Sequence, residues 1–371
     1  FRLAPNCAEW YDTEVGILKK RNIIMEIYLI GLAVALVGGL LMSRLTRLLH
    51  LPAVTAYLVA GLLLGPFFLG RLNVPGLGFN TLEEVNVLSI VSQTALGFIA
   101  FAMGNEFRLS QLRTIGSRAI IIGILQAVIT TIVVDVILLL LHLFFPHIIS
   151  VPCAITLGAI AAATAPAATL MVVRQYKADG PMTRLLMLVV ALDDAVGLLL
   201  FSVSFGIATA LSNGQVSVLA VVVEPIVEIL LSVGLGGFMG LLLHWVERFF
   251  HSRSKRMSLS VAFVMLTVGL SMLEFQIGPV HCGFSLLLVC MMTGTVFCNV
   301  CPTSDELMDR LDRWVSPINI LFFVLSGAEL DLTILSNPLV LLVGVVYIAS
   351  RSLGKICLLY TSPSPRDRSL S

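Results

Sequence analysis

Long apolar runs alternate with short polar segments along most of this 371-residue chain. A helix rises about 1.5 Å per residue, so about 20 apolar residues cross the roughly 30 Å hydrocarbon layer of a bilayer. Eleven runs are candidates for such spans, several of them shortened or interrupted by Gly or Pro, at residues 25–43, 53–70, 85–103, 118–145, 151–173, 183–211, 219–247, 258–275, 280–299, 315–328 and 338–359. The pattern predicts an all-α polytopic membrane protein with one transmembrane domain at residues 25–359.

Both ends of the chain differ from this domain. Residues 1–24 are mostly polar and begin with Phe1, so we expect a non-native or leader-like segment, with Met25 as the natural start. Residues 360–371 are rich in Ser, Pro and Arg and follow an apolar helix without a cap. They are typical of cloning or adaptor sequence, and segments of this kind carry no information about the fold.

Lys and Arg residues gather in alternate loops. If the first span begins outside, the inside loops hold Arg44, Arg47, Arg108, Arg113, Arg118, Arg174, Lys177, Arg184, Arg248, Arg253, Lys255, Arg256, Arg310 and Arg313. The outside loops hold only Arg71. Cytoplasmic loops carry an excess of basic residues, so this distribution predicts a plasma-membrane protein with its N-terminus outside.

Composition excludes several function classes. Hydrophobic residues make up 58% of the chain and charged residues 12%, and the mean hydropathy is +1.00, as expected of an integral membrane protein. The net charge is +1 without a basic stripe, so we predict no nucleic-acid partner. No phosphate-binding GxxxxGK[ST] loop occurs, and we predict no cofactor. The CxxC pair Cys298 and Cys301 lacks a second pair or a histidine near it in sequence, so it predicts no zinc site.

Two adjacent carboxylates, Asp193 and Asp194, lie near the middle of the apolar run 183–211. Ionisable side chains at mid-membrane depth are costly, and their usual explanation is functional. Neighbouring residues on a helix point about 100° apart, so two structural aspartates would each need a separate partner. The pair is therefore the main candidate for an ion and proton site.

A second feature is the sequence Thr164-Ala-Pro166 in the preceding span. Proline removes a backbone donor and clashes with the carbonyl four residues earlier, so we expect a broken helix here. Backbone groups freed by a break need protein or a water-lined cavity around them. Their oxygens and the Thr164 hydroxyl suit a hard cation such as Na⁺, although a simple proline kink is the alternative.

The last span contains Arg351 and Lys355, which share a helix face because they are four residues apart. A cation within an apolar run either reaches the interface by snorkelling or pairs with an anion. Both alternatives stay open for Lys355, with an aspartate of the sixth span as the candidate partner.

An internal repeat relates the third and tenth spans. Phe101-Ala-Met-Gly104-Asn-Glu106 closes one, and Val324-Leu-Ser-Gly327-Ala-Glu329 closes the other. Seven spans separate the copies, so they would cross in opposite directions, as in the inverted repeats of secondary transporters. A chance match is the alternative. A complete second repeat would need two more helices after residue 360, so we expect truncation by about two helices and no transport without the native continuation.

Together these residues, with the stretch from Pro52 to Pro66, resemble bacterial sodium/proton antiporters of the cation:proton antiporter-2 family over about residues 25–359. The resemblance implies a homodimer in which a core domain with broken helices moves relative to a dimerisation domain. It also implies that Asp194 binds Na⁺ or Li⁺ and H⁺, that Thr164 lies beside the ion, and that Asp193 pairs with Lys355. The second broken helix of that fold is missing from this sequence.

The implied activity is exchange of Na⁺ or Li⁺ for H⁺, without enzymatic chemistry. Because Lys355 and Asp193 would titrate as a coupled pair, a second proton would move per Na⁺, and exchange would be electrogenic. A K⁺/H⁺ antiporter or K⁺ efflux system is the nearer alternative. An intramembrane aspartyl protease is a remote one, because its carboxylates must converge from different helices.

Overall fold

The computed structural model describes residues 26, 28–46, 51–72, 74, 78–109, 117–164, 169, 172–173, 175–213, 224–273, 275–277 and 280–361. These residues are almost entirely helical, which confirms the predicted fold class. The exception is a hairpin of β1 (Phe275–Ile277) and β2 (Val280–Cys282), which pair antiparallel with Gln276 opposite His281. The predicted leader-like segment lies outside the described residues, as does the predicted tail beyond residue 361.

Each of the eleven predicted spans contains a helix. The helix of the first span covers Tyr28–Thr46. Those of the other ten are α2 (Ala53–Leu64), α4 (Ser89–Glu106), α6 (Ser117–Phe144), α7 (Val151–Ala162), α9 (Pro181–Asn213), α10 (Glu224–Glu247), α11 (Arg253–Ser271), α12 (Leu286–Val300), α13 (Ser304–Ala328) and α14 (Pro338–Thr361). The short helix α3 (Leu82–Val87) precedes α4, and η1 (Leu69–Leu72) and η3 (Leu332–Ser336) are 3-10 turns. The largest boundary differences are in α7, which ends well before residue 173, and α13, which begins well before residue 315.

Six helices of the described residues are long and apolar enough to cross a membrane. They are Tyr28–Thr46, Ala53–Leu72, Ile121–Phe144, Ile226–Glu247, Glu306–Ile334 and Pro338–Ile356. Helices α7 and α12 are apolar but shorter. The lengths support a multi-pass membrane protein, and the assignment of eleven separate crossings stays a prediction.

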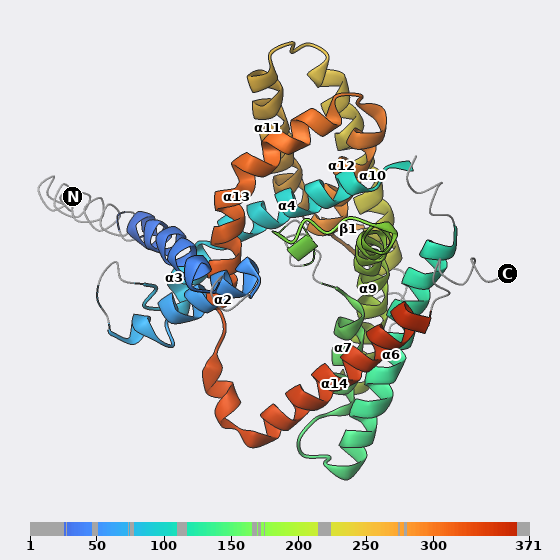
Figure 1. Cartoon of the computed structure of the whole chain (residues 1–371). Coiled ribbons are helices and arrows are strands. Elements are labelled where there is room, and N and C mark those ends of the chain that lie inside the picture. The colour runs from blue at the N-terminus through green and yellow to red at the C-terminus, as the bar shows by residue number, and fades with distance from the viewer. Residues whose placement is uncertain are drawn as a thin grey trace, which may run out of the picture. The chain divides into compact units, whose positions relative to one another are not determined.

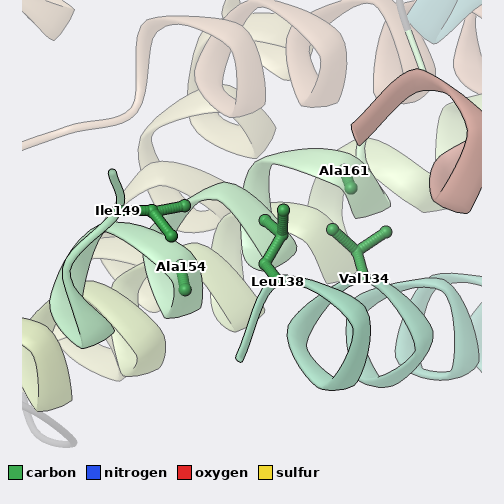
Figure 2. Packing of buried hydrophobic residues seen from close by; sticks show 5 residues of the cluster. All are labelled: Val134, Leu138, Ile149, Ala154 and Ala161. Atoms are coloured by element: carbon green, nitrogen blue, oxygen red, sulfur yellow. The ribbon is translucent and has the colours of Figure 1, made fainter. Parts of the chain in front are cut away.

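The chain divides into two compact units, one of Phe1–Ser92 with Ser316–Leu332 and one of Gln93–Val315 with Thr333–Ser371. In the larger unit, α6 packs against α7, α9 and α14, and α10 packs against α12 (Figure 1). Figure 2 shows how Val134 and Leu138 of α6 meet Ile149, Ala154 and Ala161 at α7. All five side chains are buried. Helix α14 adds Val343, Val346 and Tyr347 to this cluster.

Close glycine contacts join α4 to α12 in the larger unit. A Cβ atom added to Gly104 would lie 1.9 Å from the carbonyl oxygen of Met291, three residues before Gly294. A Cβ atom added to Gly294 would lie 2.1 Å from the carbonyl oxygen of Phe101, three residues before Gly104. Each helix therefore uses a glycine to admit the backbone of the other, as small residues do between membrane helices.

The same reciprocal glycine contact occurs in the smaller unit between α2 and the end of α13. A Cβ atom added to Gly61 would lie 1.9 Å from the carbonyl oxygen of Val324, three residues before Gly327. A Cβ atom added to Gly327 would lie 2.2 Å from that of Leu58, three residues before Gly61. The predicted repeat aligned Gly104 with Gly327 and Glu106 with Glu329, so it contained one glycine of each contact. The contacts also relate Gly61, in the second span, to Gly294, in the ninth. These two spans are seven apart, as the third and tenth are, so they form a second pair of the same repeat.

Candidate ion-binding site

Helix α7 ends within the apolar run that was predicted as the fifth span. The hydroxyl of Ser150 caps its start by accepting a hydrogen bond from the backbone N–H of Cys153 at 3.3 Å. Ala162 is the last helical residue, and Ala163 has an extended backbone with φ −63° and ψ 144°. The helix therefore breaks directly before Thr164, which is not helical. Pro166, the predicted cause of the break, lies outside the described residues.

Asp193 lies on α9, and its side chain is completely buried. Its Oδ2 atom accepts a hydrogen bond of 2.6 Å from the hydroxyl of Thr164. Its Oδ1 atom is also buried and has no hydrogen-bond partner within the described part of the chain. A buried carboxylate is costly unless it is paired, and an acceptor without a donor adds to that cost. Among the described residues, Oδ1 is thus a buried acceptor without a donor.

Lys355 of α14 provides the opposite charge. Its Nζ atom lies 3.3 Å from Oδ2 of Asp193, and the exposed fractions of the two side chains are 18% and 0%. The same ammonium group donates to the Thr164 hydroxyl and to the carbonyl oxygens of Ala162, at 2.8 Å, and Ala163, at 3.2 Å. Because the Thr164 hydroxyl accepts from Lys355 and donates to Asp193, it connects the two charged groups.

Arg351 adds a second cation one helical turn before Lys355. Its Nη2 atom donates to the carbonyl oxygen of Ala163 at 2.6 Å. The last carbonyls of a helix lack partners inside it and bear partial negative charge, so both cations stabilise the broken end of α7. Gly354 lets α14 come close to α6, since a Cβ atom there would lie 3.0 Å from Cα of Thr130. Sequence patterns did not reveal the contacts with the Ala162 and Ala163 carbonyls, because any residue supplies a carbonyl.

The structure thus brings together three of the residues selected from the sequence, Thr164, Asp193 and Lys355, which lie after the end of α7, on α9 and on α14 of one unit. Of the two alternatives for Lys355, pairing with an aspartate is the arrangement observed. Asp194 is the next residue on α9, and its side chain lies outside the described part of the structure. The assembled groups are a carboxylate, a hydroxyl and backbone carbonyls, which are oxygen ligands suited to a hard cation.

Comparison with known proteins supports the interpretation that this chain is a transporter. The sequence model of the family "Sodium/hydrogen exchanger, transmembrane" matches residues 32–371, which is most of the chain. Among characterised proteins, K(+) efflux antiporter 5 of Arabidopsis thaliana is 31% identical over 94 residues. That match covers 25% of this chain and 14% of the length of the relative.

Solved structures show the same fold. A structure of the sodium proton antiporter MjNhaP1 from Methanocaldococcus jannaschii at pH 8 has 20% sequence identity and a TM-score of 0.66, over 93% of this chain and 81% of that one. A second structure of that antiporter, from electron microscopy, has 20% identity and a TM-score of 0.68, over 89% and 77% of the two chains. At this identity the similarity establishes the antiporter fold, in agreement with the fold class predicted from the sequence.

Proposed function

This chain belongs to the sodium/hydrogen exchanger family, and we propose that it is a secondary active transporter that exchanges Na⁺ or Li⁺ for H⁺ by alternating access at Asp193, Asp194 and Thr164. The observation that supports this proposal most directly is the 2.6 Å hydrogen bond from Thr164, at the break of α7, to the buried carboxylate of Asp193. It joins the broken helix to the intramembrane acid. A break of this kind is where secondary transporters expose backbone oxygens to ions.

The proposed coupling rests on competition for one carboxylate, that of Asp194. A bound Na⁺ disfavours protonation of the carboxylate, and a bound proton removes the negative charge that holds Na⁺. If only the proton-bound and the Na⁺-bound forms cross between the two sides, each crossing exchanges one ion for the other. Thr164 would contribute an oxygen ligand beside that ion.

Everted vesicles test this proposal through the collapse of a respiration-generated pH gradient on addition of Na⁺ or Li⁺. Asp194→Asn keeps the size of the side chain and removes its charge, so it should abolish the response at every pH while the protein stays folded. Asp179→Asn is the matched control, because Asp179 is exposed in the loop before α9. Wild-type exchange by Asp194→Asn would refute the assigned role, and a full-length wild-type protein that responds to no cation would refute the antiporter function itself.

We further propose electrogenic exchange through the Asp193–Lys355 pair. The Lys355 ammonium donates to oxygens of Thr164, Ala162 and Ala163 as well as Asp193, so an arriving Na⁺ competes for the same ligands. Displaced from these acceptors in an apolar setting, Lys355 would release its proton in addition to the one that leaves Asp194. Two protons would then cross for each Na⁺. The net charge is worth about 2.3 kcal/mol per 100 mV of membrane potential.

Proteoliposomes that contain the full-length protein and a potential-sensitive dye test this step. Na⁺-driven exchange by the wild type should generate a membrane potential, and a valinomycin-clamped K⁺ potential should change its rate. Asp193→Asn combined with Lys355→Gln leaves a neutral hydrogen-bonding pair and should give electroneutral exchange. Exchange by the wild type that neither generates nor responds to a potential would show that Lys355 does not release a second proton for each Na⁺.

K⁺/H⁺ exchange is a second candidate, favoured by the 94-residue similarity to a plant protein named as a K(+) efflux antiporter. Oxygen ligands alone do not distinguish Na⁺ from K⁺, because selectivity depends on cavity size, ligand number and flexibility. The same vesicle assay separates the candidates. A response to K⁺ that saturates at a lower concentration than the response to Na⁺ would establish K⁺ as the substrate.

We also propose that the protein acts as a homodimer in the plasma membrane with its N-terminus outside. Arg248 lies in the loop between α10 and α11, and Arg253, Lys255 and Arg256 lie in the first turn of α11. The positive-inside rule assigns such a basic end to the cytoplasm. Labelling of single cysteines introduced at exposed loop positions on intact cells tests the orientation. Labelling of the α10–α11 loop by a membrane-impermeant reagent would contradict it.

A further inference from the structure

A compact group of side chains where α10 ends contains three different types of metal ligand. His244 and Glu247 are one turn apart on α10, and Cys301 directly follows α12. One ligand atom from each of the three residues lies within 4.8 Å of the other two. We propose that His244, Glu247 and Cys301 form a binding site for a divalent transition-metal ion, with Zn²⁺ as the ion that this donor set fits best.

The carboxylate and the thiol are already positioned for such an ion. Glu247 is 3% exposed and Cys301 is 5% exposed, and the Cys301 thiol donates to Oε2 of Glu247 at 3.1 Å. A tetrahedral Zn²⁺ about 2.3 Å from a sulfur and about 2.0 Å from an oxygen holds those two atoms roughly 3.5 Å apart. Replacing the thiol proton by the metal therefore requires only a small separation of the two side chains.

The other oxygen of Glu247 is held from the opposite direction. Oε1 lies 3.5 Å from Nε of Arg256 and accepts a hydrogen bond of 3.3 Å from the hydroxyl of Thr303. Arg256 is itself fixed by a 2.7 Å hydrogen bond to the carbonyl oxygen of Phe250. These contacts leave Oε2 directed at Cys301. Outer groups that orient a ligating carboxylate in this way raise metal affinity, usually by about 10–100-fold.

A ring nitrogen of His244 supports a bound metal ion, because it is buried without a partner in the described part of the chain. Its Nδ1 atom is buried and has no hydrogen-bond partner within the described residues. Its Nε2 atom lies 2.8 Å from Nη2 of Arg248, which donates to it. With Nε2 accepting from Arg248, the imidazole proton is on Nδ1. Arg248 is exposed and can swing into solvent, after which a metal binds Nε2 directly, or binds Nδ1 once that proton has moved to Nε2. A buried imidazole nitrogen without a partner is otherwise a net cost to folding.

The donor set selects the class of metal. A thiolate, an imidazole and a carboxylate together favour Zn²⁺ or Co²⁺ over Mg²⁺ and Ca²⁺, which prefer all-oxygen sites. Three protein ligands leave a fourth position for a water molecule. Binding is a proton-for-metal substitution, since the Cys301 thiol releases its proton to solvent as the sulfur–metal bond forms, and no oxidation or reduction is involved.

The test uses the purified full chain in detergent, with any histidine tag removed and with bound metal stripped by a chelator. Titration with Co²⁺ should produce a near-ultraviolet sulfur-to-cobalt charge-transfer band that saturates at one ion per chain. Zn²⁺ should abolish that band, and competition with a chromophoric chelator gives its affinity. Cys301→Ser keeps a donor to Glu247 but should eliminate the band and weaken Zn²⁺ binding by about 100-fold or more.

Matched controls separate this site from surface binding. Cys153→Ser and His251→Asn remove an exposed cysteine and an exposed histidine and should leave the band and the affinity unchanged. Arg248→Gln should strengthen Zn²⁺ binding several-fold, because it removes a positive charge and the guanidinium group that donates to Nε2 of His244. Size-exclusion chromatography verifies that each variant is folded. No stoichiometric Co²⁺ band in the folded wild type, or the same band in Cys301→Ser, would overturn the proposal.

Discussion

Replacing Gly104 with alanine should destabilise the protein, because the clash created at α12 exceeds the gain in helix propensity. An added Cβ atom would lie 1.9 Å from the carbonyl oxygen of Met291 and 2.8 Å from the backbone nitrogen of Thr295. Ordinary contact begins at 3.4 Å, so the two backbones must separate by about 1.5 Å. Overpacking typically costs about 1–3 kcal/mol, and the backbone on both sides of this contact cannot rotate away as a side chain can.

Glycine-to-alanine replacement within a helix otherwise stabilises it by about 0.5–1 kcal/mol. Gly237 of α10 is the matched control, since a Cβ atom there would meet no atom within 4 Å. Thermal unfolding in detergent should therefore show a higher melting temperature for Gly237→Ala and a lower one for Gly104→Ala, with a decrease of about 2–3 °C for a net loss of about 2 kcal/mol. An unchanged or raised melting temperature for Gly104→Ala would refute the close α4–α12 contact.

Three further predictions concern the charged and polar groups. Thr164→Val should raise the Na⁺ concentration for half-maximal exchange about tenfold or more, whereas Thr164→Ser, which keeps the hydroxyl, should stay near wild type in the vesicle assay. Lys355→Gln alone should lower the free energy of unfolding by about 3–5 kcal/mol, because it leaves Asp193 buried without a counter-charge. The combination with Asp193→Asn should recover at least half of that loss in denaturant titrations. In metal-free buffer, Arg256→Gln should lower the free energy of unfolding by about 2–4 kcal/mol, because the side chain of its partner Glu247 is only 4% exposed. Breaking the exposed Arg253–Glu306 pair should lower it by about 1 kcal/mol or less.

The helices and the main site residues could be predicted because the bilayer makes sequence patterns unusually informative. A spanning segment must satisfy its backbone internally, so a long apolar run has few alternatives to a helix. For the same reason a charge within such a run stands out. Asp193 and Lys355 were selected on this basis, and they lie 3.3 Å apart.

Helix boundaries were less predictable where the hydrophobicity of a segment does not match its tendency to form a helix. The segment that begins α13 is charged, so hydrophobicity excluded it from the tenth span, yet Glu306, Leu307, Met308 and Arg310 are all good helix formers. In α7 the opposite occurs. Apolar residues continue past Ala162, but the chain becomes extended at Ala163.

The cluster of His244, Glu247 and Cys301 was missed because its members are far apart in the sequence. In the sequence, the CxxC spacing pairs Cys301 with Cys298. In the structure the sulfur of Cys298 lies 3.8 Å from the carbonyl oxygen of Gly104, whereas that of Cys301 contacts Glu247. The only local signal was His244 and Glu247 at i and i+3 on one helix, a spacing too common to indicate a metal site.

The position of Lys355 suggests why an exchanger would place a second cation beside its acidic site. The ammonium group contacts two carbonyl oxygens, a hydroxyl and a carboxylate, a ligand set that would equally suit Na⁺. A site without this lysine would leave the buried Asp193 carboxylate without the ammonium group that lies 3.3 Å from it whenever no Na⁺ was bound, at a cost of several kcal/mol. With the lysine, the empty site is stabilised by a cation that belongs to the protein. In the proposed exchange, an arriving Na⁺ would take over these oxygen contacts from the ammonium group. The net free energy of binding would therefore stay small enough for release on the opposite side.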